Sequence, residues 1–327
     1  MKRNGLYLIG LVMLAILPLI FSNEYTLHLL ILVAINVIFA SSLNLISGYV
    51  GELSLGHAAF AGLGAYTTAL ISLSGFSPWL GLAGAVAVTL VVSYLFGLIV
   101  IRLRGAYFVI SSLAFQMALF YTASNWIGLT HGPMGLLNIP RPGLWIPGVG
   151  SIQLNSKVSF YYLSVIIAFV IVMACKRLVR SPIGETWVAI RENEKLSAAV
   201  GLDRTKYVTF AFVFAAVFAG IGGWLLAHYI QVVSPGDNMS FDLIIGMILM
   251  VVIGGRGTIV GPILGAVVVT FLPEYLRGMG NWRLTVYGVI LGVLVIFLPH
   301  GIMQLWGIGS SRLQQGLFAG LAVKRKG

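Results

Sequence analysis

Hydrophobic residues in this chain fall in long runs that lack the periodic polar positions of a helix or strand at a water surface. A transmembrane helix needs about 20 apolar residues, because a rise of about 1.5 Å per residue must cover a hydrocarbon core of about 30 Å. The candidate spans are 5–22, 25–46, 57–73, 79–101, 106–124, 158–176, 207–233, 241–254, 257–273 and 284–303. The pattern predicts an all-α polytopic membrane protein with about eight to ten transmembrane helices, some short or broken.

Three of these runs depart from the usual pattern. Runs 241–254 and 257–273 are short, so they form either a hairpin of two short helices or one long bent span. The first run follows Lys2 and Arg3, as in a signal peptide, but it exceeds the usual hydrophobic region of about 7–15 residues and no A-x-A-like cleavage site follows. We therefore expect an uncleaved first span.

Composition and charge support a membrane protein with a defined orientation. The chain is 59% hydrophobic and 9% charged, with a mean hydropathy of +0.99. The net charge of +11 does not indicate a nucleic-acid-binding protein, because the basic residues punctuate apolar runs and form no patch. With ten spans and a cytoplasmic N-terminus, all but four of the 20 basic residues fall on the cytoplasmic side. The exceptions are Arg141, Lys157, Arg277 and Arg283.

Residues 44–66 carry glycines and polar side chains where a lipid-facing helix would carry Leu, Ile and Val. Non-helical backbone at membrane depth is tolerated only inside the protein or beside a water-filled cavity. This stretch is therefore the first candidate for a translocation path or gate. Its candidate residues are Gly48, Gly51, Glu52, Ser54, Gly56 and His57.

A second glycine-rich stretch lies at 254–265. Gly257, Gly261 and Gly265 are spaced by four residues and would line one helix face, which permits close helix packing. The preceding Gly254, Gly255, Arg256 and Gly257 indicate a break between half-helices and are further candidates for the path. Paired glycine-interrupted segments are typical of transport sites, and residues 44–66 and 246–268 could be such a pair.

Two connections are too long to be simple loops: 125–157 on the outer side and 177–206 on the inner side. In the second, Ser181 and Pro182 favour a helix start and Gly201 a stop, with an amphipathic helix over 185–200. It could lie at the lipid headgroups or dock a cytoplasmic partner. The mixed charge of residues 191–195 favours a partner.

Several kinds of chemistry have no motif here. The sequence contains no G-x-x-x-x-G-K-[ST] phosphate loop, no H-E-x-x-H and no G-x-S-x-G. The single cysteine, Cys175, excludes an intramolecular disulfide and a cysteine-based zinc site. We therefore expect neither an enzyme nor a metal site, but a passage without its own motor.

Five stretches, in order along nearly the whole chain, resemble the branched-chain amino acid ABC transporter permeases of the LivM type. They are NLISGYVGELSLGHAAF (44–60), LRGAYF (103–108), LTHGPMGL (129–136), AIRENE (189–194) and GGRGTIVGP (254–262). The resemblance implies a permease subunit in the bacterial inner membrane, with both termini in the cytoplasm. It also implies a second permease, two cytoplasmic ATPase subunits that bind the ATP, and a periplasmic protein that delivers Leu, Ile or Val. No cofactor is expected in this chain.

The resemblance also maps the coupling region of such permeases onto residues 181–201. The candidate ATPase-coupling residues are Glu185, Arg191, Glu192, Asn193, Glu194, Ala198, Ala199 and Gly201. Ser197 stands where the Glu-Ala-Ala…Gly loop of importer permeases has Glu, so more weight falls on residues 191–194. We expect one permease domain over 1–303, with the coupling loop 177–206 and the outer loop 125–157, followed by a basic cytoplasmic tail over 304–327. Alternatives are an ABC permease for urea or short amides, a stand-alone facilitator or channel, and a membrane enzyme.

Overall fold

The computed structural model describes residue 18 and residues 23–146, 150–153, 156–298 and 301–303. The predicted first span over 5–22 lies, apart from Pro18, outside the described residues, as does the predicted tail over 304–327. The bundle is formed by α2 (Glu24–Asn44) with its π-helical continuation η1 (Leu45–Val50), α3 (His57–Leu73), α4 (Pro78–Val100), α5 (Ala106–Asn125), α7 (Lys157–Val179), α10 (Arg204–Ile230), α12 (Phe241–Gly254), α13 (Gly261–Tyr275) and α14 (Arg283–Phe297).

Seven helical stretches of the described residues are long and apolar enough to cross a membrane. They include α2 continued by η1, and α13 continued into the 3₁₀ segment η3 (Leu276–Trp282). Helix α3 is shorter, with 17 residues, and α14 contains a shorter apolar stretch over Thr285–Leu294. The all-α polytopic prediction is confirmed, while the predicted total of eight to ten spans stays a prediction.

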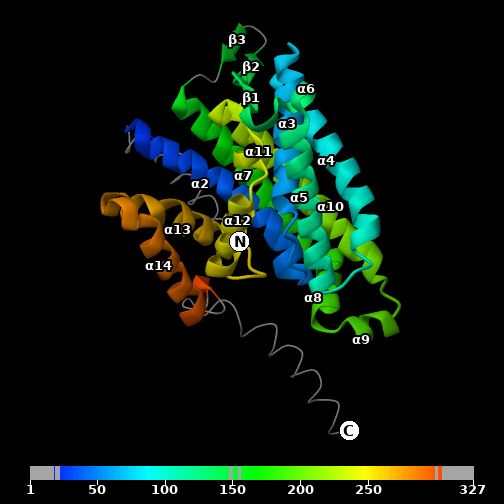
Figure 1. The fold of residues 1–327 in the computed structure, drawn as a ribbon. Coiled ribbons are helices and arrows are strands. Elements are labelled where there is room, and N and C mark those ends of the chain that lie inside the picture. The colour runs from blue at the N-terminus through cyan, green and yellow to red at the C-terminus, as the bar shows by residue number, and fades with distance from the viewer. Residues whose placement is uncertain (1–17, 19–22, 147–149, 154–155, 299–300, 304–327) are drawn as a thin grey trace, which may run out of the picture.

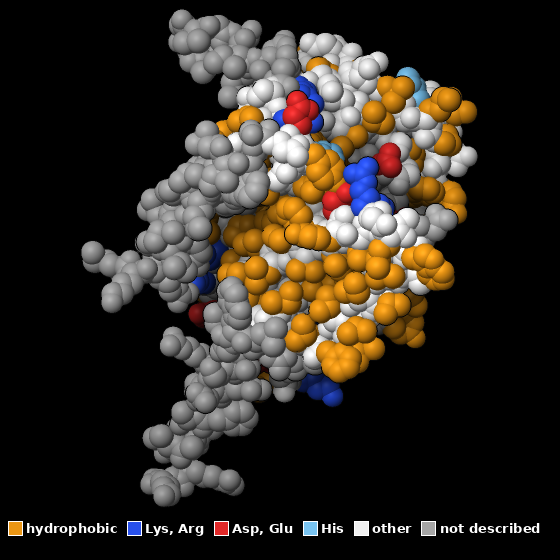
Figure 2. Space-filling view, turned by 90° about the vertical axis from the view of Figure 1, so that its left-hand side faces the viewer, with side chains coloured by type: hydrophobic (Ala, Val, Ile, Leu, Met, Phe, Trp, Pro, Cys, Tyr) orange, Lys and Arg blue, Asp and Glu red, His pale blue; other side chains and the backbone are white. Residues whose placement is uncertain are grey.

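Helices α2 and α10 form the centre of the bundle (Figure 1). In their most apolar windows 78% and 67% of the residues are buried, against 28% for α4 and 22% for α5. Helix α10 packs against α3 and α4, and α2 packs against α7 and α13. On the side turned to the viewer in Figure 2, a broad field of hydrophobic side chains separates the charged ones. Such a field suits contact with lipid tails.

The two ends of the bundle carry the remaining short elements (Figure 1). One end, called here the α8–α9 end, holds α8 (Pro182–Glu192) and α9 (Glu194–Ala199). The other, called the strand end, holds the segment predicted as an outer loop. This segment contains α6 (Ile127–Thr130), the 3₁₀ turn η2 (Gly132–Met134), β1 (Leu136–Leu137), β2 (Gly143–Ile146) and β3 (Gly150–Gln153).

Pairing of strands fastens this loop to the bundle. β1 is antiparallel to β4 (Val232–Val233), with Leu136 opposite Val233, and β2 is antiparallel to β3, with Gly143 opposite Gln153. Because β4 directly follows α10, the β1–β4 pair ties the loop to the end of α10. The short helix α11 (Pro235–Asn238) comes next and leads into α12.

Two sequence expectations were wrong in detail. The helix expected over 185–200 begins earlier, with the Ser181 side chain capping Gly184 N as predicted, and it is two helices. Asn193 separates them with φ −154° and ψ 95°, an extended conformation that an α-helix cannot contain. Gly257 does not share a helix face with Gly261 and Gly265. It lies before α13, in the turn of residues 255–260, with φ +69°.

Residues 241–273 form a hairpin of two helices, one of the two arrangements expected. Helix α12 ends at Gly254, and Gly255 has φ +119°, a conformation available mainly to glycine. Gly265 faces α12 so closely that an added Cβ would overlap the Met250 carbonyl oxygen. A glycine is therefore required at this helix contact, as expected for Gly261 and Gly265.

We predict that Gly265→Ala destabilises the protein while Gly246→Ala does not. Both glycines lie inside helices, so alanine raises helix propensity by about 1 kcal/mol at each. A Cβ at Gly246 meets nothing within 4 Å, whereas at Gly265 it forces α12 and α13 apart, at a cost of about 1–3 kcal/mol. Thermal unfolding in detergent should show a lower midpoint for Gly265→Ala alone. Equal midpoints for the two variants would contradict the close contact.

Candidate functional site

Helix α2 leaves regular α geometry where it reaches the α8–α9 end of the bundle. After Asn44 the chain continues as the π-helix η1, so Gly48 lies inside a helix and the predicted break begins only at Gly51. Gly51 has φ +88°, and its N–H donates to the Ile46 carbonyl. Single π turns within helices are frequent at functional sites. Residues 51–56 then run without helical structure to the start of α3.

The Asn44 side chain joins the two glycine-rich stretches. Its Nδ2 donates to the Thr258 carbonyl oxygen at 2.8 Å, and its Oδ1 accepts from Gly257 N at 2.9 Å. A Cβ on Gly48 would lie 2.5 Å from Gly257 N, which only a glycine avoids. The two stretches, paired in the sequence only by their glycines, thus lie in contact. Asn44 was not among the predicted site residues, although an amide in a membrane helix is a known signal for contact between helices.

Arg191 of α8 reaches the same place. Its Nη1 donates to the Gly48 carbonyl oxygen at 2.5 Å, and a Cβ on Gly51 would lie 2.6 Å from Arg191 Cγ. A Cβ on Gly257 would lie 3.0 Å from Arg191 Nη1. A predicted coupling residue therefore contacts both predicted gate stretches. We call Asn44, Gly48, Gly51, Arg191, Gly257 and Thr258 the glycine junction.

A group of ion pairs lies beside the glycine junction. Glu52 pairs with Arg204 at the start of α10, and these side chains are 16% and 11% exposed. Arg204 also donates to the Ile101 carbonyl at 2.6 Å and lies 3.7 Å from Glu194, which pairs with Arg104 at 2.7 Å. Removing one member of such a partly buried pair leaves the other charge unpaired, which costs more than losing an exposed pair. We call Glu52, Arg104, Glu194 and Arg204 the ion-pair cluster.

Neither arginine of this cluster was among the predicted site residues. The signal that could have found them is Glu52 itself, because a carboxylate near membrane depth needs a basic partner. Through Glu194, the cluster connects α9 with Arg104, two residues before α5, and with Glu52 in the non-helical segment.

The α8 and α9 helices are held from inside and open on the outside. Trp187 is fully buried, and its Nε1 donates to the Tyr207 carbonyl of α10 at 2.8 Å. Of the predicted coupling residues, Glu185, Arg191, Glu192, Asn193, Ala198, Ala199 and Gly201 are exposed, and Glu194 is half-buried. Leu196 and Val200 are also exposed, at 63% and 69%, and the prediction did not include them. Leu196 and Val200 are four positions apart at the end of α9, so together they offer a small apolar surface to a partner.

Ser197, which departs from the importer motif, is buried. Its hydroxyl donates to the Asn193 carbonyl at 2.9 Å and thereby holds the break between α8 and α9. Beside this break lies an open cleft of about 430 Å³, lined by Arg104, Glu192, Asn193, Glu194, Lys195 and Ala198. Charges of both signs line it, so it suits a protein partner better than an anionic lipid surface.

The other predicted gate residues lie apart from the glycine junction. Ser54, Gly56 and His57 are buried at the start of α3. A Cβ on Gly56 would lie 2.8 Å from the Ser112 carbonyl of α5. In the second stretch, Gly254 packs against the Gly261 carbonyl and Arg256 is exposed. The structure thus divides the predicted site into the glycine junction and the start of α3.

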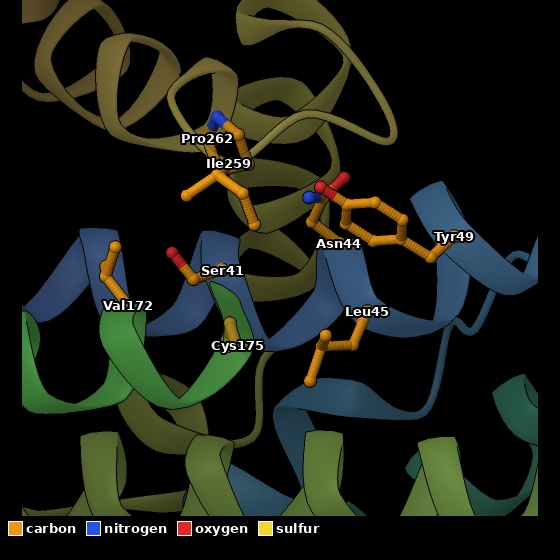
Figure 3. Close-up of a pocket in the computed structure, with 8 residues that line it drawn as sticks. All are labelled: Ser41, Asn44, Leu45, Tyr49, Val172, Cys175, Ile259 and Pro262. Carbon is orange, nitrogen blue, oxygen red and sulfur yellow. The ribbon is translucent and has the colours of Figure 1, made fainter. Parts of the chain in front are cut away.

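A small cavity adjoins Asn44 between α2, α7 and the α12–α13 turn (Figure 3). Its lining residues are Ser41, Asn44, Leu45, Tyr49, Val172, Cys175, Ile259 and Pro262. Its volume of about 10 Å³ is close to that of one water molecule. This cavity is therefore a packing gap beside the glycine junction, far too small for an amino acid.

We predict that Asn44→Leu loosens the α12–α13 turn. The substitution leaves Gly257 N and the Thr258 carbonyl without their partner, at a cost of about 1–3 kcal/mol for each buried group. Amide hydrogen exchange over residues 255–260 should become at least several-fold faster. Asn125→Leu is the control, because Asn125 is exposed and bonds within its own helix. Unchanged exchange in Asn44→Leu would show that Asn44 does not hold the turn.

Comparison with known proteins places this architecture in a family. A family model described as branched-chain amino acid transport system / permease component matches residues 25–299. The high-affinity branched-chain amino acid transport system permease protein LivM of Escherichia coli (strain K12) is 29% identical over 324 residues, covering 93% of this chain and 76% of LivM. LivH of the same strain is 22% identical over 284 residues, covering 81% of this chain and 90% of LivH.

The fructose import permease protein FrcC of Rhizobium meliloti is also similar, with 23% identity over 226 residues, 68% of this chain and 62% of FrcC. No solved structure matches the chain. The family model covers all the described helices from α2 to α14, including the glycine junction, the ion-pair cluster and α8–α9. The chain therefore belongs to the family of permease components of branched-chain amino acid transport systems.

Proposed function

We propose that this chain is the membrane-spanning permease subunit of an ATP-driven importer that carries branched-chain amino acids across the bacterial inner membrane. It acts with a second, similar permease, two ATPase subunits that bind the ATP, and a periplasmic protein that delivers the substrate. The chain itself carries out no catalytic step. The observation that carries the proposal is Arg191, which joins the exposed α8–α9 surface to both glycine breaks of the membrane domain.

Charge distribution supports a cytoplasmic position for the α8–α9 end. Ten described Lys and Arg residues lie in the segments that contain, flank or contact α8 and α9: Arg102, Arg104, Lys176, Arg177, Arg180, Arg191, Lys195, Arg204, Lys206 and Arg256. Of the other four, Arg141 lies between β1 and β2, Lys157 and Arg277 bond to residues at the start of α2, and Arg283 begins α14. Basic residues accumulate on the cytoplasmic side of membrane proteins. In this proposal the strand end faces the periplasm and receives the binding protein, and both termini lie in the cytoplasm.

The contacts suggest how force from the ATPases reaches the path. A push on α8 moves Arg191 against Gly48 and Gly51 and so displaces η1 relative to the α12–α13 turn. A push on α9 moves Glu194, which is paired with Arg104 before α5 and lies near Arg204. Both routes start in α8 or α9 and lead to residues of the membrane domain that lie at or beside a break in helical structure. In this proposal such displacements open the path first at the strand end and then at the α8–α9 end.

The alternatives differ in substrate or in motor. An importer of urea or short amides would use the same coupling surface, and the similarity to a fructose import permease shows that sequences of this kind serve other cargo. A stand-alone facilitator would need no ATPase. The exposed Leu196 and Val200 favour the ATPase-driven importer, because a facilitator gains nothing from an apolar patch in water.

We predict that Leu196→Asp abolishes ATP-dependent leucine uptake by the complete transporter in proteoliposomes. A carboxylate placed in an apolar contact would be desolvated without a partner, which weakens binding of the ATPase by 100-fold or more at a cost of about 3 kcal/mol. Met134→Asp is the matched control for ATPase co-purification alone, because Met134 is 84% exposed at the strand end, far from α8–α9, where a new charge can affect only the binding protein. Co-purification of the ATPase should fail for Leu196→Asp alone. Normal uptake and co-purification in both variants would overturn the docking assignment and favour a facilitator.

We predict that Gly51→Ala lowers leucine uptake at least tenfold while Gly75→Ala leaves it nearly unchanged. Both glycines have left-handed backbone, with φ +88° and +86°, so alanine imposes a similar strain of about 1–2 kcal/mol at each. Only at Gly51 does the new Cβ displace Arg191, because nothing lies within 4 Å of a Cβ at Gly75. Uptake reduced equally in the two variants would mean that backbone strain, and not the contact with α8, causes the loss.

A further inference from the structure

Helix α3 begins in the middle of the bundle and not at its surface. The Phe60 and Phe212 rings are 5.5 Å apart, a Cβ on Gly64 would overlap Gly220, and Thr68 Oγ1 lies 2.8 Å from His228 Nε2. Helix α3 therefore runs beside the second half of α10. Since the 27 residues of α10 span about 40 Å, the first turn of α3 lies about 20 Å from either end of α10.

The segment before α3 crosses the other half of the membrane domain without helical structure. Glu52 is paired with Arg204 at the start of α10, and the imidazole of His57 lies beside the backbone of Ala215 near the middle of α10. In a membrane, backbone of this kind occurs only inside protein or beside a passage for water or substrate. The N–H groups of the first helical turn also give the start of a helix a partial positive charge.

The polar side chains around this helix start are buried and lack hydrogen-bond partners within the described part of the chain. Ser54 Oγ and both ring nitrogens of His57 are fully buried, and none makes a hydrogen bond of ordinary geometry among the described residues. A buried polar group without a partner costs about 1–3 kcal/mol. Such groups in a native protein call for an explanation, and one explanation is a ligand absent from the closed state.

Gln116 of α5 closes the site. Its Oε1 accepts from Ala59 N in the first turn of α3 at 2.6 Å, and its Nε2 donates to the Met239 carbonyl, between α11 and α12, at 2.6 Å. One turn earlier on α5, the Ser112 hydroxyl accepts from Leu55 N at 3.0 Å. An oxygen of α5 thus already occupies the start of α3. The oxygen is neutral, whereas a helix start stabilises an anionic oxygen more strongly.

We propose that the first turn of α3, with Ser54 and His57, is a subsite for the carboxylate of the transported amino acid, closed in this conformation by the Gln116 side chain. The inference rests on the proposed transport function. When α5 moves away, carrying Gln116 and Ser112 with it, a carboxylate oxygen takes the place of Gln116 Oε1. Ser54 and His57 then donate to the same carboxylate.

Two features of the surroundings fit a passing substrate. Two arginines near the segment that leads into α3 are already paired, Arg204 with Glu52 and Arg104 with Glu194. Neutral donors at a helix start hold an anion without trapping it, as a transport path requires. Helix α5 is also among the least buried helices of the bundle, with 22% of its most apolar window buried, so few packing contacts oppose its movement.

The test uses the complete transporter in proteoliposomes, carrying Cys175→Ser and a single new cysteine at position 54 (Ser54→Cys). Modification is measured with anionic and cationic methanethiosulfonate reagents during ATP turnover. We expect the anionic reagent to react about fivefold faster than the cationic one, after correction for their rates with a free thiol, because a helix start stabilises an anion by about 1 kcal/mol. Leucine should slow the reaction. Adding Gln116→Leu should allow modification without ATP.

The matched control is Ser93→Cys, at a fully buried serine on α4 that bonds within its own helix and should stay unmodified throughout. His57→Cys repeats the measurement if Ser54→Cys does not assemble. Any of three outcomes would overturn the subsite. The new cysteine could stay unmodified in every state, the cationic reagent could react as fast as the anionic one or faster, or leucine could fail to slow the reaction. Failure of the transport function itself is seen separately, as absence of leucine uptake by the Cys175→Ser transporter that lacks the new cysteine.

Discussion

The need to satisfy every backbone polar group at membrane depth determines how this structure is built. The chain leaves helical geometry at Gly51 and again at Gly255, and in both places side chains from other helices supply hydrogen bonds. Asn44 serves the second break, whereas Ser112 and Gln116 serve the segment that leads into α3. Because these supports come from α2 and α5, the breaks and the helices around them move as connected parts.

This constraint explains why glycine recurs where it does. At Gly48, Gly51 and Gly257 the backbones of η1 and the α12–α13 turn and the Arg191 side chain approach so closely that a Cβ has no room. The same closeness makes the glycine junction sensitive to small displacements of α8. Tight contact between non-helical segments, and not a large cavity, is what connects the exposed surface with the interior.

Much of this architecture could be predicted from the sequence, because membrane spans depend on local composition. The apolar runs predicted α2, α3, α4, α5, α7, α10, α12, α13 and α14, with all ends but that of α14 within about four residues, and the glycines marked both breaks. The contact of Arg191 with Gly48 could not be predicted, since it joins residues 143 positions apart through packing that no local pattern encodes. The single helix expected over 185–200 was wrong because Asn193 can cap a new helix as easily as continue an old one.

Asn44 and Gln116 are the most informative omissions from the predicted site. Both are amides within apolar runs, where each unpaired polar group is costly, so each had to have partners across the bundle. The sequence could have marked them as contacts between helices. It could not have said that Gln116 reaches the first turn of α3, because that depends on where α3 begins relative to α10.

The π-helix η1 has a consequence for how this chain can change in evolution. A π turn holds one residue more than an α turn, so deletion of any residue within Leu45–Val50 would return the segment to α geometry. Such a deletion would keep the residues after it in register, because a π turn covers nearly the same rotation and rise as an α turn that is one residue shorter. Gly51 would therefore still face Arg191. A deletion in the regular part of α2 would instead turn every following residue by about 100° around the helix axis, so loss of a residue is tolerated in the π segment and not in the helix before it.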